Sequence, residues 1–86
     1  MYTKSNLIEA GKSYIIQQKY QLAEEVFKEA SQLDPKNDDI YCELGKIYSI
    51  QQRYAEAIER LEGAIALNQD NIRAHFLLAK AYREKS

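Results

Sequence analysis

The chain has 86 residues, with 12 Lys and Arg against 13 Asp and Glu, so its formal net charge is −1. A chain this short buries only about 60% of its unfolded surface, which argues against a large enzyme core with a deep cleft. The near-neutral charge argues against a dedicated nucleic-acid binder, which usually carries a basic excess on one face. The single cysteine, Cys42, cannot form an intrachain disulfide, and one His beside one Cys leaves little for a metal site or another cofactor.

No stretch of the sequence resembles a targeting signal or a membrane span. Residues 1–6 are polar, and the uninterrupted apolar runs are only a few residues long. The composition therefore predicts a soluble chain of a reducing compartment. We expect a cytoplasmic location, with neither a membrane nor a nucleic acid as partner.

The chain repeats itself with a period of 34 residues. Residues 4–37 aligned with residues 38–71 are identical at 13 of 34 positions. A third copy begins at residue 72, ends at residue 86 and keeps a leucine, a lysine and a tyrosine of the second copy. We therefore predict one domain, 1–86, made of repeat one (4–37), repeat two (38–71) and a partial third repeat or capping helix (72–86).

The first copy contains two apolar series at helical spacing. One runs over residues 7–18, and Ser5 or Asn6 can cap its start. Residues 17–20 form the turn, and the second series covers residues 22–33. The end of the second helix is well marked, because Pro35 cannot continue a helical hydrogen-bond ladder. The first copy thus predicts a helix–turn–helix.

The second copy predicts the same two helices, and the third copy predicts one more. Asp38 or Asp39 can cap the third helix, and the fourth carries apolar residues from 57 to 67. Gln69 stands where repeat one has Pro35, which predicts a looser turn before a fifth helix over 72–84. Period-2 alternation is absent and the apolar pattern shifts phase at each turn, so strands and a coiled coil are both disfavoured.

At these spacings the sequence resembles the tetratricopeptide repeat (TPR) family, a 34-residue helix–turn–helix with small and aromatic residues in fixed columns. Repeat one has Leu7-x2-Ala10-Gly11-x2-Tyr14, Ala23-x3-Phe27, Ala30 and Pro35; repeat two has Tyr41-x2-Leu44-Gly45-x2-Tyr48, Ala57-x3-Leu61 and Ala64; the third has His75-x2-Leu78-Ala79-x2-Tyr82. The resemblance covers residues 4–86 and departs from the family pattern in lacking a Trp in the first column.

The resemblance implies an all-α, right-handed superhelix (an alpha-alpha solenoid) of five antiparallel helices, in which the first helices line a concave groove. Gly11, Gly45 and Ala79 then lie where helices cross, because small residues let two backbones approach closely. Tyrosines in the repeating columns are expected in the core; these are Tyr14, Tyr20, Tyr48, Tyr54 and Tyr82. Stacking of neighbouring repeats supplies that core.

Residues of the first helices that avoid the packing columns should face the groove. They are Ser5, Ile8, Lys12, Ile15, Ile16, Asp39, Cys42, Lys46, Ser49, Ile50, Arg73, Phe76, Leu77, Lys80, Arg83 and Glu84. Ten of them are selected as candidate site residues: Ile8, Lys12, Ile15, Cys42, Lys46, Ser49, Arg73, Phe76, Leu77 and Lys80. The mixture of lysines and apolar side chains suits an extended or helical peptide with acidic and apolar anchors.

The lysine column also has a purely structural interpretation. Glu9 with Lys12 and Glu43 with Lys46 are spaced to pair on one helix face, whereas Lys80 has no such partner before it. A second family feature, the clamp that some members use for acidic chaperone tails, requires Lys, Asn, Asn, Lys and Arg at five places. This chain has Ile8, Lys12, Glu43, Arg73 and Leu77 there. Only Arg73 fits, so the clamp is not expected.

The C-terminal helix is apolar on more than one face. The face near Ala74, Leu78 and Ala81 is expected to lack a covering helix, which suggests a piece of a longer array that self-associates through this end. Net charge differs by segment, being 0 over residues 1–37, −4 over 38–71 and +3 over 72–86. Such a pattern is typical of a solvated surface and also compatible with head-to-tail stacking of copies.

The remaining candidates have simple interpretations. His75 shares a column with Leu7 and Tyr41 and is predicted to pack, and Cys42 has no His placed to make it a nucleophile. The leading hypothesis is a non-catalytic module that binds a peptide segment or partner protein in its groove, as part of a larger protein. The alternative is a structural unit that self-assembles through its C-terminal helix. An enzyme ranks third, because no nucleophile–base pair, phosphate loop or metal set is present.

Overall fold

The protein is all α-helical, as predicted. Its computed structural model describes residues 3–85, apart from the side chains of residues 4 and 5. Five helices and no strand occupy that range, and they are α1 (Lys4–Ile16), α2 (Tyr20–Leu33), α3 (Asp38–Ile50), α4 (Tyr54–Leu67) and α5 (Ile72–Lys85). α1, α3 and α5 begin at residues 4, 38 and 72, so the helix boundaries follow the sequence repeat. None of the described helices combines the length and the apolar character needed to cross a bilayer.

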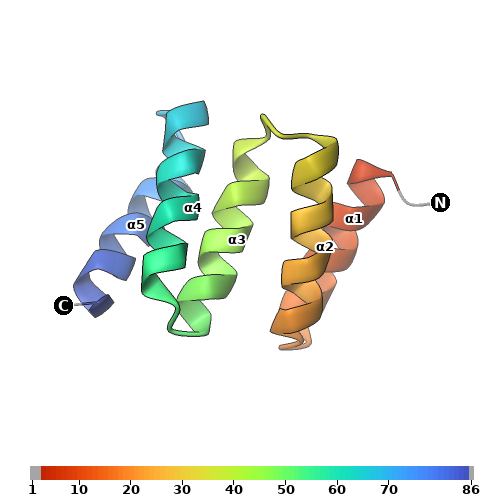
Figure 1. Ribbon diagram of the computed structural model, residues 1–86, viewed down its shortest axis with the longest axis horizontal. Helices are drawn as coiled ribbons and strands as arrows, with labels where there is room; N and C mark the ends of the chain where they lie inside the picture. Colours follow the sequence, from red (N-terminus) through yellow and green to blue (C-terminus); the bar gives the residue numbers. More distant parts are fainter. Residues whose placement is uncertain (1–2, 86) are drawn as a thin grey trace.

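The helices form an elongated antiparallel stack. Figure 1 shows them in chain order from α1 at one end to α5 at the other, with α1 behind α2 and α5 behind α4. The overall dimensions are 41 × 26 × 17 Å. Each helix packs on its neighbours in sequence, and α3 also contacts α5. The first helix of every pair therefore lies on the same side of the stack.

The helix caps lie one or more residues earlier than expected. Thr3 caps α1, its side-chain oxygen accepting a hydrogen bond from the Asn6 backbone N–H at 3.2 Å. Asn37 caps α3 and accepts from the Asp39 backbone N–H at 3.0 Å. The predictions that Ser5 or Asn6, and Asp38 or Asp39, would act as caps are wrong, because these residues are already helical.

The turn between α4 and α5, which lacks a proline, is fastened to α3. The side-chain amides of Asn68 and Asn71 donate to Asp38 Oδ2 at 3.1 and 2.7 Å. Asn71 also caps α5, accepting from the Ala74 backbone N–H at 2.9 Å. These contacts tie the turn to the start of α3 and α5.

The core consists of two clusters that cross the repeat boundaries. The first joins α1, α2, α3 and Ala57 of α4, and its buried side chains are Leu7, Ala23, Phe27, Ala30, Ile40, Leu44, Ile47, Tyr48 and Ala57. The second joins α3, α4 and α5, and its buried side chains are Cys42, Ile58, Leu61, Ala64, Ala74 and Ala81. Neither cluster is supplied by one repeat alone, as expected for a solenoid.

Two glycines permit the close crossing of paired helices. A Cβ added at Gly11 would lie 2.5 Å from Phe27 Cε2, and one added at Gly45 would lie 2.5 Å from Leu61 Cγ. The prediction that both stand at helix crossings is confirmed. The same prediction for Ala79 is wrong: its side chain is exposed, because no helix among the described residues covers this side of α5.

Alanine at Gly45 and alanine at Gly63 should have opposite effects on stability. Gly45→Ala is expected to lower the free energy of unfolding by about 1–2 kcal/mol, because overpacking outweighs the gain in helix propensity. Gly63 has nothing within 4 Å of an added Cβ, so Gly63→Ala should raise stability by about 0.5–1 kcal/mol. Urea denaturation followed by circular dichroism measures both, and stabilisation by Gly45→Ala would contradict the close crossing.

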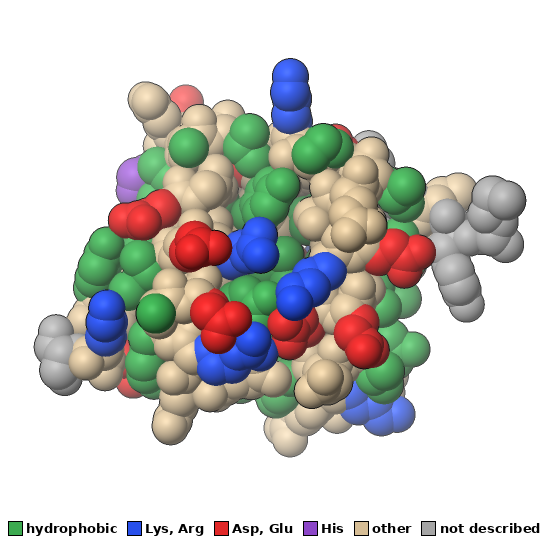
Figure 2. Space-filling model, viewed as in Figure 1, with side chains coloured by type: hydrophobic (Ala, Val, Ile, Leu, Met, Phe, Trp, Pro, Cys, Tyr) green, Lys and Arg blue, Asp and Glu red, His purple; other side chains and the backbone are tan. Residues whose placement is uncertain are grey.

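The uncovered face of α5 differs from the predicted one. Ala74 and Ala81, expected to be open, are 0% and 1% exposed because they pack against α3 and α4. The open face instead carries Ile72 and Phe76, which are 81% and 66% exposed, whereas Tyr82, 47% exposed, donates a hydrogen bond to Glu62 Oε2 of α4 at 3.0 Å. Figure 2 shows hydrophobic side chains gathered at this end of the molecule. Tyr82 is therefore an exception to the predicted tyrosine core, whereas Tyr48 is buried and the other three are half-buried.

Candidate binding groove

Three adjoining hollows run along the side of the molecule formed by α1, α3 and α5. The first, about 320 Å³, lies mainly between α3 and α5. The second, about 110 Å³, and the third, about 290 Å³, lie where α1, α3 and α5 meet. Lys46 is common to the first and third hollows, and Lys12, Glu43 and Arg73 are common to the second and third. The hollows therefore form one continuous groove, and the first alone reaches the size of small-ligand sites.

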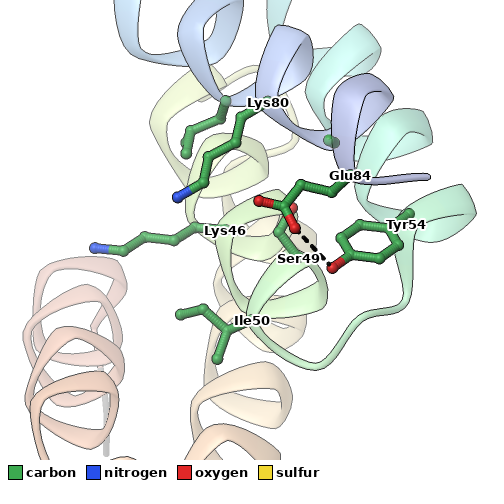
Figure 3. Close-up of a pocket in the computed structure, with 8 residues that line it drawn as sticks. Lys46, Ser49, Ile50, Tyr54, Lys80 and Glu84 are labelled. Atoms are coloured by element: carbon green, nitrogen blue, oxygen red, sulfur yellow. Dashed lines mark hydrogen bonds between the residues drawn. The ribbon is translucent and has the colours of Figure 1, made fainter. Parts of the chain in front are cut away.

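The hollow between α3 and α5 combines an apolar floor with polar side chains at its edge. Its lining residues are Lys46, Ser49, Ile50, Tyr54, Leu77, Lys80, Ala81 and Glu84. Figure 3 shows Lys46 and Lys80 extending in the same direction from the two helices. The Glu84 carboxylate accepts a hydrogen bond from the Tyr54 hydroxyl at 3.4 Å. The Ser49 Oγ is buried and has no hydrogen-bond partner within the described part of the chain.

An ion pair between α3 and α5 crosses the floor of the groove. The Arg73 guanidinium donates to Glu43 Oε1, and Glu43 is 5% exposed. Burial opposes the charge of Arg73, but the hydrogen bond and the charge of Glu43 outweigh it and raise the arginine pKa. The structural interpretation that Glu43 pairs with Lys46 is therefore wrong, because the carboxylate is turned to the arginine of the next repeat.

The three groove lysines are left without acidic partners. Lys12 lines the second and third hollows, Lys46 the third and first, and Lys80 the first. Among the residues that the structure describes, no carboxylate lies within ion-pair distance of any of these three side chains. They occupy one column of the repeat, at intervals of 34 residues. Within residues 3–85, the groove thus presents a row of cations that form no ion pair.

Eight of the ten candidate residues line the groove. They are Ile8, Lys12, Ile15, Lys46, Ser49, Arg73, Leu77 and Lys80. Cys42 does not, because it is fully buried in the cluster between α3, α4 and α5. Phe76 lines none of the three hollows and lies on the uncovered face of α5. Ile16, Asp39, Ile50 and Glu84 of the wider set also line the groove, whereas Arg83 does not and the Ser5 side chain lies outside the described residues.

Cys42 and His75, the two residues weighed as chemical groups, lie in different surroundings. Burial raises the pKa of the Cys42 thiol, which disfavours the reactive thiolate. His75 is exposed instead of packed as predicted, and its Nε2 lies 2.9 Å from the Gln69 carbonyl oxygen. No cluster of three or more His, Cys, Asp or Glu side chains suited to a metal ion occurs in residues 3–85.

Sequence reasoning missed a charged network on the opposite side of the molecule. Glu24 of α2, 7% exposed, accepts hydrogen bonds from the Tyr48 hydroxyl and from Arg53 Nη1, both at 3.0 Å. Lys28 forms an ion pair with the same carboxylate at 3.0 Å. Figure 2 shows acidic and basic side chains interleaved at the centre of this face. The one signal of this network in the sequence was a difference between the repeats: Glu24 of repeat one corresponds to the apolar Ile58 of repeat two.

Several solved structures have the same fold as this chain. The first TPR domain of Spaghetti (RPAP3), bound to the HSP90 peptide SRMEEVD, matches with a TM-score of 0.93 and 24% identity over 95% of this chain and 67% of that one. The Arabidopsis OM64 TPR domain matches with a TM-score of 0.92 and 18% identity, covering 95% and 68%. MamA of AMB-1 matches with a TM-score of 0.85 and 24% identity, covering 96% and 45%. At these identities the likeness shows the fold alone.

The family assignment comes from the sequence. A search among curated proteins finds no match. The family model for the tetratricopeptide repeat matches residues 14–81, which is most of the chain. The helix–turn–helix pairs, the glycine crossings and the 34-residue period agree with that match. The chain belongs to the tetratricopeptide repeat family.

Proposed function

We propose that the protein is a non-catalytic interaction module that binds a peptide segment of a partner protein in the groove along α1, α3 and α5. The observation that carries the proposal is the continuous groove, which combines an apolar hollow with a row of lysines that have no ion-pair partner among the described residues. Groups of this kind recognise a peptide by apolar anchors and by its charge. Tetratricopeptide repeats are protein-interaction folds, and the RPAP3 domain of the same fold holds an HSP90 peptide.

The proposal does not extend to an acidic chaperone tail held by the family's clamp. Three clamp positions carry residues that oppose a carboxylate or cannot bind one, namely Ile8, Glu43 and Leu77. Glu43 also engages Arg73, the one residue that fits the clamp. The partner is therefore expected to be a different peptide, and the likeness to the RPAP3 domain supports only the general mode of binding.

Blocking the apolar hollow should abolish peptide binding. The full chain is used to select binders from a phage library that displays random dodecapeptides, and the selected peptides are measured by fluorescence anisotropy. Ile50→Glu is expected to weaken them by at least about tenfold, because a carboxylate replaces an apolar contact in the hollow. Leu67→Glu is the matched control: Leu67 is 42% exposed and Ile50 43%, and Leu67 lies outside the groove. Failure to select any peptide, or equal binding by both variants, would refute the groove function.

A second candidate function is self-assembly through α5. The exposed Ile72 and Phe76 side chains, one helical turn apart on α5, favour it, because exposed apolar side chains that share a helix face tend to be covered by another helix. Sedimentation velocity over a range of concentrations should then show association that the double variant Ile72→Lys, Phe76→Lys removes. A wild-type chain that stays monomeric at high concentration would rule this role out.

A further inference from the structure

The groove lysines define what kind of ligand the groove can neutralise. Lys12, Lys46 and Lys80 come from α1, α3 and α5 and lie in successive hollows of the same groove. Figure 3 shows Lys46 and Lys80 extending in the same direction from the two helices. Three like charges without counterions attract a segment that carries negative charges along its length.

The carboxylates of the groove do not satisfy these lysines. Glu43 is bound to Arg73, and Glu84 is turned toward the Tyr54 hydroxyl. Asp39 lines only the second hollow, at the end of the groove away from Lys80. Around the third hollow the cations Lys12, Lys46 and Arg73 face a single carboxylate, that of Glu43. The centre of the groove is therefore its most positive part.

The hollow between α3 and α5 adds a place for one apolar side chain. Ile50, Leu77 and Ala81 line it, and Lys46 and Lys80 stand at its edge. An apolar residue seated there puts its flanking residues beside both amines. The unpartnered Ser49 hydroxyl lies in the same lining and, after rotation of its side chain, can bond a ligand carbonyl.

The ion pair between Arg73 and Glu43 limits which acidic group of a ligand the groove can bind. Arg73 is the groove's one guanidinium within the described residues, and a guanidinium binds a carboxylate with two parallel hydrogen bonds. Glu43 already occupies it, so an incoming C-terminal carboxylate finds no free arginine. The remaining cations are lysines, which act as point charges. They bind the carboxylates of side chains along a segment as well as they bind a C-terminal carboxylate.

We propose that the groove selects an acidic segment of a protein chain, with carboxylate side chains over Lys12, Lys46 and Lys80 and an apolar side chain in the hollow between α3 and α5. Recognition does not require a free C-terminus, because Glu43 acts as an internal carboxylate on Arg73. This inference rests on the proposed peptide-binding function and specifies its ligand.

The composition of the selected peptides is the first test. The phage library displays each dodecapeptide with its C-terminus fused to the coat protein, so no free carboxylate is offered. Selection on the wild-type chain should enrich Glu and Asp around an apolar residue. The triple variant Lys12→Ala, Lys46→Ala, Lys80→Ala should lose that enrichment, and the control Lys19→Ala, Lys36→Ala, altered at exposed lysines outside the groove, should keep it.

Affinity measurements complete the test. An enriched peptide made as its amide should bind the triple variant roughly tenfold or more weakly than wild type, and should weaken as salt is raised. The same peptide with a free C-terminus should bind wild type within about twofold of the amide. Glu43→Gln, which releases Arg73, should favour the free-carboxylate form by several-fold.

The outcomes separate this inference from the function on which it rests. Selected peptides that are neutral or basic, yet are weakened by Ile50→Glu, would overturn the acidic ligand and leave the groove function standing. Unchanged affinity in the triple variant would likewise overturn the acidic ligand and leave the groove function standing. Equal preference of Glu43→Gln and wild type for the free-carboxylate peptide would overturn the role of Glu43. Peptides unaffected by Ile50→Glu would refute the groove function itself.

Discussion

Replacing Phe27 by alanine is expected to lower the free energy of unfolding by about 3–5 kcal/mol, because the change removes a fully buried ring from the centre of a core cluster. For a domain of this size the melting temperature should fall by roughly 15 °C or more. Phe27 lies between α1 and α3, sharing the cluster with Leu7 and Ile40. Circular dichroism in urea and on heating measures both quantities.

The loss should be greatest at the N-terminal helix. α1 packs mainly on α2, and the Phe27 ring lies against Gly11 of α1. In a solenoid each repeat is stabilised by its neighbours, so a cavity at this junction releases the terminal helix before the rest. Amide hydrogen exchange in the Phe27→Ala variant should therefore accelerate more in α1 than in α4. Uniform acceleration along the chain would contradict this local opening.

A double-mutant cycle tests the reason for the loss. The three atoms nearest to a Cβ added at Gly11 all belong to the Phe27 ring. Gly11→Ala should destabilise the wild type but should be neutral or stabilising in the Phe27→Ala background, where the ring is gone. Leu33→Ala is the single-site control, because Leu33 lies on the same helix as Phe27 and is 58% exposed. An additive cycle would refute the contact between Gly11 and Phe27.

The sequence predicted those features that recur with the repeat. The 34-residue register located all five helices, and the glycine column identified the crossings at Gly11 and Gly45. Helical periodicity also placed Lys12, Lys46 and Lys80 on the groove side. These predictions held because each depends on contacts within one helix pair or on the spacing along one helix.

The features that the sequence did not predict depend on how successive repeats are placed. Glu43 and Arg73 are 30 residues apart, and only the position of α5 against α3 brings them together. Cys42 was assigned to the groove, yet the packing of α5 against α3 and α4 buries it. Phe76 stands at the same repeat position as Cys42 and remains 66% exposed, because no further helix covers α5 in the described chain. One column can therefore be buried in one repeat and open in the next.

The network around Glu24 should contribute more to stability than an ordinary surface ion pair. Its carboxylate joins α2 to Tyr48 of α3 and to Arg53, the residue before α4, whose guanidinium also lies 4.4 Å from the centre of the Tyr48 ring. Glu24→Ala is expected to lower the free energy of unfolding by about 2–3 kcal/mol, because it strands the buried Tyr48 hydroxyl as well as removing the ion pairs. The double variant Glu24→Ile, Tyr48→Phe removes both the carboxylate and the hydroxyl, and it places at position 24 the isoleucine that repeat two has in the same column. This variant should recover most of the loss.

The same carboxylate should make stability fall in acid. Burial by itself raises the pKa of Glu24, but the hydrogen bonds from Lys28, Arg53 and Tyr48 together outweigh burial and hold the pKa below its ordinary value. A carboxyl whose pKa is lower in the folded state stabilises the fold fully above its unfolded pKa of about 4.3, and that contribution is lost as the pH falls through the folded pKa. Urea denaturation at about pH 7 and at about pH 3 should therefore show a larger loss for wild type than for Glu24→Gln. Glu56, whose pKa is also lowered by Arg53, is present in both chains, so equal acid sensitivity of the two would assign the effect to Glu56 and contradict the role of Glu24.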